Sequence, residues 1–174
     1  PNTINIKLNY IAQFNDISDS IERYEGISGP TDEVSELLNS FKSFDIKSPL
    51  PGCSSHTSIR ELIFQGPLKL KEASKSACDV YCFLFTDMLL ITQLKKASKK
   101  YRIIKPPVPT NRMLVKELTQ TDKAFVVFSL NDYNVPDSVN MFISNFSRKW
   151  IEYLELSKVI IITLSNTPNY KLRI

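Results

Sequence analysis

The sequence is poor in the residues from which many catalytic and metal sites are built. It has three cysteines, one histidine and four glycines among 174 residues. Three thiols are too few, and too oddly numbered, for a disulfide framework, which favours a reducing compartment. The four glycines are too scattered to form a phosphate-binding loop. His56 lies near Cys53 in a linker-like stretch with no third group to orient it, so we predict no catalytic residues and no cofactor.

Long apolar runs are missing as well. The longest aliphatic run covers residues 159–162, far short of the roughly 18 residues that a membrane span needs. The chain starts at Pro1 without a methionine or a signal peptide. We therefore expect a piece of a longer cytoplasmic protein.

Cysteine spacing also argues against a metal site. Cys78 and Cys82 lie four residues apart on a predicted strand, about 13 Å at 3.3 Å per residue. One tetrahedral zinc ion cannot hold both thiolates without breaking that strand. Buried thiols and no bound metal are expected.

The formal net charge of +4 conceals a gradient along the chain. Residues 1–60 carry five Lys/Arg against eight Asp/Glu, whereas residues 69–105 carry nine against three. The positive field is therefore concentrated on the segments that flank residues 80–92.

The N-terminal part has helical periodicity. Apolar residues recur every three or four positions over residues 4–24, which predicts one amphipathic helix ended by Gly26 and the Gly29–Pro30 pair. Thr31 is suited to cap a second, shorter helix. Residues 45–60, rich in proline and serine, are typical of a linker.

Residues 80–92 form the central element of the predicted fold. Two apolar runs meet at Thr86 and Asp87, a spacing that favours a two-residue hairpin of undecided turn type. In the first run Val80, Cys82 and Leu84 alternate with equally apolar neighbours. A strand of this kind is covered on both faces, one lining a small barrel and the other lying under a further element.

Seven strands are predicted after Arg60, followed by a helix. We place the strands at residues 62–71, 78–85, 88–94, 101–105, 113–118, 124–130 and 139–144. Ser144 or Asn145 is expected to cap a helix whose inner face carries Phe146, Trp150, Tyr153, Leu154 and Ser157. The prediction is an α+β fold, a seven-stranded antiparallel barrel whose open end is plugged by Trp150.

These motifs resemble a pleckstrin homology (PH) domain. The hairpin at 81–92, the strand Glu-Leu-Ile-Phe-Gln-Gly-Pro-Leu-Lys-Leu at 61–70 and the helix around Trp150 are similar to PH domains that follow the Dbl-homology (DH) domain of Rho guanine nucleotide exchange factors. Residues 79–87 and 103–107 most resemble the family G of PH-domain-containing exchange factors. The resemblance covers residues 61–154.

The resemblance implies a domain division and a function. Residues 1–44 would be the last helix of a DH-like bundle plus a short helix, 45–60 a linker, 61–158 the PH domain and 159–174 a C-terminal extension. The β-branched run at the start of that extension leaves a strand, a longer helix or a contact surface open. The module would be non-catalytic, cytoplasmic and peripheral to a membrane, and would position a DH domain on a Rho-family GTPase.

Anionic phospholipid headgroups are the ligand that the basic residues suggest. PH domains that bind phosphoinositides tightly carry basic residues early in the second strand, where this chain has Asp79 and Tyr81. A diffuse patch with weak, salt-sensitive attraction is therefore expected. Its residues are Lys69, Lys71, Lys75, Lys95, Lys96, Lys99, Lys100 and Arg102.

Other binding modes have weaker support. The basic loops carry only Tyr101 as a stacking aromatic, so nucleic acid is not an expected partner. Pro106 to Pro109 match the minimal PxxP pattern, although breaking a strand explains them better. The alternative function is a protein-interaction module of the same fold, binding a peptide along a strand edge without lipid.

Overall fold

The computed structural model describes residues 17–22, 24–25, 43–44, 46–47, 50, 60–72, 75–119 and 123–166. Residues 17–20 are helical and precede eleven strands, one 3₁₀ turn and one long helix within that part of the chain. In chain order these elements are β1 (Ile21–Glu22), β2 (Tyr24–Glu25), β3 (Ser43–Phe44), β4 (Leu62–Lys71), β5 (Cys78–Phe85), β6 (Met88–Lys95), β7 (Lys100–Ile103), β8 (Val108–Pro109), η1 (Thr110–Arg112), β9 (Met113–Glu117), β10 (Ala124–Leu130), β11 (Pro136–Ile143) and α3 (Ser147–Asn166).

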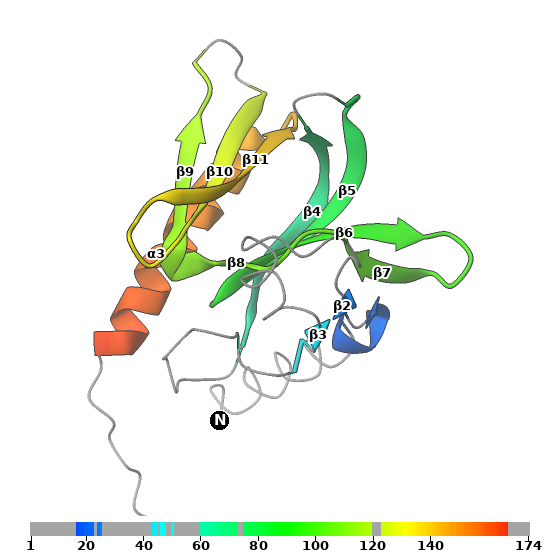
Figure 1. Ribbon diagram of the computed structural model, residues 1–174, viewed down its shortest axis with the longest axis horizontal. Coiled ribbons are helices and arrows are strands. Elements are labelled where there is room, and N and C mark those ends of the chain that lie inside the picture. The colour runs from blue at the N-terminus through cyan, green and yellow to red at the C-terminus, as the bar shows by residue number, and fades with distance from the viewer. Residues whose placement is uncertain are drawn as a thin grey trace, which may run out of the picture.

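The main sheet is a curled antiparallel meander. Its strands follow the order β1, β7, β6, β5, β4, β11, β10, β9, and only β1 joins by parallel pairing. Figure 1 shows β4 to β7 on one side, β9 to β11 on the other, and α3 running along the latter. No ladder joins β7 to β9 in the described chain; η1 and β8, which pairs with β6, fill that side.

The predicted plug is confirmed. Trp150 is 2% exposed and lies in the inner core with Leu154. Its ring meets Phe64 of β4 edge-on, with centroids 4.8 Å apart, and Tyr153 stacks on Phe64 with centroids 4.4 Å apart. A Cβ at Gly66 would lie 3.7 Å from Trp150 Cζ2, so β4 approaches the indole closely. The helix therefore closes the sheet through its aromatic side chains.

Both faces of β5 are covered, as its sequence predicted. Val80, Cys82 and Leu84 point into the inner core, while Phe83 and Phe85 belong to a second core on the opposite face. This outer core consists of Ile21, Ile46, Leu50, Phe83, Phe85, Met88, Leu90 and Ile103. The segment that precedes the barrel thus covers the outer face of β5, β6 and β7, where each large apolar side chain contributes about 2 kcal/mol on burial.

The N-terminal helix ends earlier than its periodicity predicted. Residues 17–20 are helical, but Ile21–Glu22 form β1 and pair in parallel with Tyr101 and Arg102 of β7. The helix gives way because Ile21 is buried in the outer core and its backbone bonds to β7. Most of the two predicted helices lies outside the described residues. At the end of the second predicted helix, Ser43–Phe44 form β3, which pairs with β2.

The expected linker is packed at the positions that the structure describes. Ile46 and Leu50 are buried in the outer core, and Arg60 bonds to the β5–β6 turn. Composition predicted a linker without these contacts being evident, because prolines and serines outnumber the few apolar residues.

Strand boundaries agree closely with the predictions, with two corrections. The stretch from Pro106 to Pro109 was expected to break a strand, yet Val108 pairs with Leu89 and Pro109 with Met88. The connection predicted between the strands at 124–130 and 139–144 is shorter, because Asn131 Oδ1 accepts hydrogen bonds from the backbone N–H groups of Tyr133 and Val135, so that β11 starts at Pro136.

The helix differs from its prediction at its start, and its C-terminal end takes one of the alternatives left open, a longer helix. Phe146, expected on the inner face, is 69% exposed just before α3. Ser144 Oγ accepts a hydrogen bond from the backbone N–H of Phe146 at 3.0 Å, which closes the turn into the helix instead of capping the first helical turn. The C-terminal run from residue 159 continues α3 to Asn166. No helix in the described chain is both long and apolar enough to cross a bilayer.

Candidate functional site

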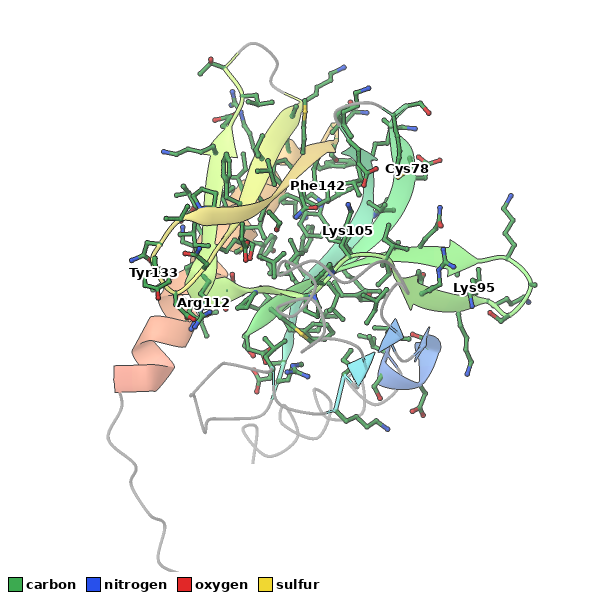
Figure 2. The ribbon with its side chains drawn as sticks, viewed as in Figure 1. Cys78, Lys95, Lys105, Arg112, Tyr133 and Phe142 are labelled. Carbon is green, nitrogen blue, oxygen red and sulfur yellow. The ribbon has the colours of Figure 1, made fainter. Side chains whose placement is uncertain are left out.

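The eight predicted lipid-binding residues fall into two groups. Lys69 and Lys71 lie on β4 and Lys75 in the turn that follows; we call these the turn group. Lys95, Lys96, Lys99, Lys100 and Arg102 form the hairpin group on β6, β7 and their connection. Figure 2 places Lys95 on the hairpin that projects to the right and Cys78 at the top, beside the β4–β5 turn. The structure does not gather the eight cations into one pocket.

The turn group is engaged with nearby oxygens. Lys69 Nζ lies 2.9 Å from Asp79 Oδ1, and Lys75 Nζ lies 2.8 Å from Glu72 Oε2. Lys71 Nζ donates to the carbonyl oxygen of Lys75 at 2.8 Å. Exposed ion pairs of this kind add little stability, but they leave less positive potential for an external anion.

Glu72 joins this group to a lysine that the sequence interpretation did not include. Its second oxygen, Oε1, lies 2.6 Å from Lys105 Nζ. The hydrogen bond from Lys105, followed by that from Lys75, lowers the pKa of Glu72 from 4.5 to about 2. The same hydrogen bond with Glu72 raises the pKa of Lys75. Nothing in the local sequence links residues 72 and 105, which meet only when β7 returns along the sheet.

The hairpin group is exposed, and fewer of its cations have a carboxylate partner than in the turn group. All five residues are exposed. Among the described side chains, no carboxylate forms an ion pair with Lys96, Lys99, Lys100 or Arg102. Leu94, 50% exposed, adds an apolar side chain at the base of the hairpin. Four exposed cations without a described carboxylate partner, Lys96, Lys99, Lys100 and Arg102, therefore lie together on this hairpin.

The backbone of the hairpin holds these charges in register. Lys95 pairs with Lys100 and Gln93 with Arg102 across β6 and β7. Lys99 takes a positive φ of 55°, and its N–H donates to the Lys95 carbonyl at 2.9 Å. A left-handed lysine costs about 1 kcal/mol, which the closing hydrogen bond offsets.

Aromatic packing stiffens the base of the hairpin. The Tyr101 ring lies 5.0 Å from Tyr81 and 5.1 Å from Phe83, centroid to centroid. Burial raises the pKa of Tyr81. Since Tyr101 packs on β5, the one aromatic considered for base stacking is part of the outer core surface.

A charged clamp fastens the chain before β4 to the central hairpin. Arg60 Nε lies 2.9 Å from Asp87 Oδ1, and Nη2 lies 2.6 Å from Oδ2. Arg60 Nη1 also donates to the Ile46 carbonyl. On the other side, Thr110 Oγ1 donates to the Thr86 carbonyl at 3.0 Å. The predicted two-residue turn is thus fixed from both flanks, and neither Thr86 nor Asp87 has a positive φ.

The cysteines that the structure describes have no catalytic environment. Cys82 is fully buried in the inner core, where burial raises the pKa of its thiol, and Cys78 is half-buried. Cys53 and His56 lie outside the described residues. Among those described, no three potential metal ligands come together.

Known proteins are similar to this chain in sequence. Pleckstrin homology domain-containing family G member 5 of Mus musculus is 38% identical over 114 residues, 66% of this chain and 10% of that protein. The Homo sapiens family G member 6 is 34% identical over 116 residues, 66% of this chain and 14% of that protein. The chain therefore spans only about a tenth of these relatives.

Solved structures show the same fold. The complex of PDZ-RhoGEF DH/PH domains with GTP-γ-S activated RhoA matches with a TM-score of 0.63 at 17% identity, over 90% of this chain and 40% of that chain. The linker-DH/PH domains of p115-RhoGEF match with a TM-score of 0.61 at 14% identity, over 87% of this chain and 39% of that one. A family model described as a pleckstrin homology domain matches residues 62–154, just over half of the sequence. The chain belongs to the pleckstrin homology domain family.

Proposed function

We propose that this chain is the regulatory and targeting PH module of a Rho guanine nucleotide exchange factor. It is weakly attracted to anionic membrane surfaces in the cytoplasm and positions a catalytic DH domain on a Rho-family GTPase. Its relatives are family G members, and its structural neighbours are DH/PH domains, some in complex with RhoA. The described chain contains the PH domain and no catalytic domain.

The observation that carries the membrane proposal is the hairpin group. Lys96, Lys99, Lys100 and Arg102 project on a stiff hairpin. In the turn group, Lys69 is paired with Asp79 and Lys75 with Glu72. Each basic residue near an anionic leaflet contributes about 1 kcal/mol. Four or five such contributions correspond to a dissociation constant near the millimolar range. Attraction to the membrane is therefore weak unless another part of the protein also binds there.

The outer core supports the positioning role. Ile21, Ile46 and Leu50 pack against β5 to β7, and β1 pairs with β7. The segment that enters the barrel is thereby fixed to the same strands that carry the hairpin group. An upstream domain connected through this segment would keep a defined orientation to the membrane.

Vesicle sedimentation tests the membrane proposal. The chain should bind vesicles containing phosphatidylserine at about 10 mM salt, where charges act over about 30 Å, and lose most binding at about 150 mM. The pair Lys96→Glu and Lys100→Glu should abolish binding. The matched control, Lys116→Glu with Arg148→Glu, reverses the same charge on exposed residues of β9 and α3. Equal binding to neutral and anionic vesicles, or equal loss in both variants, would refute the proposal.

The positioning role is tested in the parent protein. Exchange on a membrane-attached Rho GTPase should be faster with anionic vesicles than in solution, and the hairpin variant should lose only that acceleration. A variant that slows exchange equally with and without vesicles would instead point to damage in the catalytic unit.

A protein-interaction module is the second candidate. In the described chain β9 is the last strand of the sheet and pairs only with β10. The neighbouring β10–β11 hairpin exposes Tyr133, Val135 and Val139. A peptide could add along this edge. Specific peptide capture without any vesicle binding would favour this function over membrane targeting.

A further inference from the structure

We propose that Ser98 is a phosphorylation site for a serine kinase that selects basic sequences, and that the phosphate cancels much of the positive charge of the hairpin group. The inference rests on the proposed targeting function and deepens it, because it gives the membrane contact a means of release. Ser98 lies in the connection between β6 and β7, among the cations on which that contact depends.

Lysines flank Ser98 closely on both sides. Residues 95–100 read Lys-Lys-Ala-Ser-Lys-Lys, which places cations three and two residues before the serine and one and two residues after it. These six residues include no carboxylate. An enzyme that binds this segment needs an acidic groove, since carboxylates on the enzyme must match the ammonium groups. The expected partner is therefore a serine kinase with an acidic substrate groove.

The folded chain presents this serine to solvent. Residues 93–100 are all exposed, and Ser98 lies in the turn at 96–99. Figure 2 shows Lys95 on the β6–β7 hairpin, which projects away from the rest of the sheet. A kinase can thus reach Ser98 without disturbing either core.

The turn around Ser98 is able to open locally. The Lys99 N–H donates to the Lys95 carbonyl at 2.9 Å, and the Lys100 N–H donates to Ser98 Oγ across a long 3.4 Å. Lys99 has a φ of 55°, a left-handed conformation that is unfavourable for a lysine. Exposed loop tips with these features open at low free energy. The serine can therefore enter an active site while the base of the hairpin stays paired.

The phosphoryl group comes from ATP. Ser98 Oγ attacks the γ-phosphorus and forms a new O–P bond. The bond between the γ-phosphorus and the oxygen that bridges it to the β-phosphate breaks, and ADP leaves. The hydroxyl proton passes to a carboxylate of the kinase. The product is a phosphate monoester with a charge of about −1.5 to −2 at pH 7.

This charge appears in the middle of the hairpin group. The group has five cations, so one phosphate offsets about two of them. Each cation near an anionic leaflet strengthens binding about fivefold, and the loss of two should weaken it about 30-fold. Phosphorylation would therefore release the hairpin from the membrane.

A kinase assay tests the site itself. The whole chain is incubated with ATP and the catalytic fragment of protein kinase C, and the modified residues are located by mass spectrometry. Ser98 should be phosphorylated in the folded chain. Ser147 is the internal control, because two basic residues follow it as they follow Ser98, but it is 2% exposed at the start of α3. Ser147 should be modified only after unfolding. Absence of phosphate on Ser98, or modification of both serines at one rate, would overturn the proposal, because the folded hairpin would then not be what the kinase selects.

Vesicle sedimentation at low salt tests the effect of the charge. On vesicles containing phosphatidylserine, the phosphorylated chain should bind about 30-fold more weakly than the unmodified chain, and Ser98→Glu about fivefold more weakly. Ser98→Asn should bind like the unmodified chain. Ser138→Glu adds the same charge to an exposed residue of β11 and should bind within about twofold of it.

The outcomes of the two assays are distinguishable. Unchanged vesicle binding after phosphorylation, or equal losses in Ser98→Glu and Ser138→Glu, would overturn the proposed switch. If the unmodified chain binds no anionic vesicles, the targeting function fails, and the phosphorylation site is decided by the kinase assay, which contains no membrane.

Discussion

Arg60 and Asp87 face each other across 27 residues of sequence and form a bidentate ion pair, with Nη2 2.6 Å from Oδ2 and Nε 2.9 Å from Oδ1. The side chains are only 8% and 25% exposed. The pair ties the entry to β4 to the turn between β5 and β6, at the boundary between the barrel and the segment that covers it.

Removal of Arg60 should therefore destabilise the fold. In Arg60→Ala the Asp87 carboxylate stays partly buried without its partner, and we expect a loss of about 2 kcal/mol in the free energy of unfolding. Urea denaturation followed by Trp150 fluorescence measures this. Lys69→Ala breaks the exposed pair with Asp79 and should change stability by less than about 0.5 kcal/mol. Similar losses in the two variants would contradict the buried clamp.

The closing helix makes a second prediction. Trp150→Ala should cost about 3 to 5 kcal/mol, because it removes the indole from a core site and leaves a cavity against Phe64. Phe146→Ala, just before the same helix, should cost less than about 0.5 kcal/mol, since that ring is 69% exposed. Thermal unfolding by far-UV circular dichroism distinguishes them. A tolerated Trp150→Ala would mean that the indole does not seal the barrel.

Acid should weaken the contribution of Glu72. Its folded pKa is lowered from 4.5 to about 2, so its stabilising effect is complete above pH 4.5 and is lost as the pH falls toward 2. Because the side chain is 30% exposed, solvent screening limits the effect to about 1 kcal/mol. Urea unfolding of the native chain and Glu72→Gln should differ at pH 6 and converge near pH 2. A difference that does not change with pH would point to packing rather than charge.

The two thiols on β5 should react at very different rates. Burial keeps Cys82 protonated and unreachable, whereas Cys78 is half-buried near the start of the strand. In a Cys53→Ser background, a disulfide reagent should label Cys78 first and Cys82 only after unfolding. Labelling of both at one rate under native conditions would show that β5 opens locally.

Much of the barrel is predictable from local pattern. The bounds of β4, β5 and β10 follow from the pattern of side chains along each strand and from the turn residues beside them. The inward position of Trp150 follows from the helical spacing of the apolar residues around it. Those signals are local because neighbouring side chains on one strand or helix face share one environment.

The contacts that the sequence did not predict all depend on the approach of distant segments. Arg60 meets Asp87, and Lys105 meets Glu72, only after the sheet has curled. Likewise Ile21 leaves a helical pattern because β7 offers it a partner strand. Of the eight predicted site residues, the structure separates three engaged lysines from the hairpin group, a division that charge counting cannot make.

The parallel pairing of Ile21 and Glu22 with β7 couples the orientation of the incoming chain to that of β7. β7 pairs with the incoming chain at β1 and is also one of the two strands of the lysine-bearing hairpin. If that hairpin were to rotate onto a charged bilayer as proposed, the incoming chain paired with β7 would rotate with it.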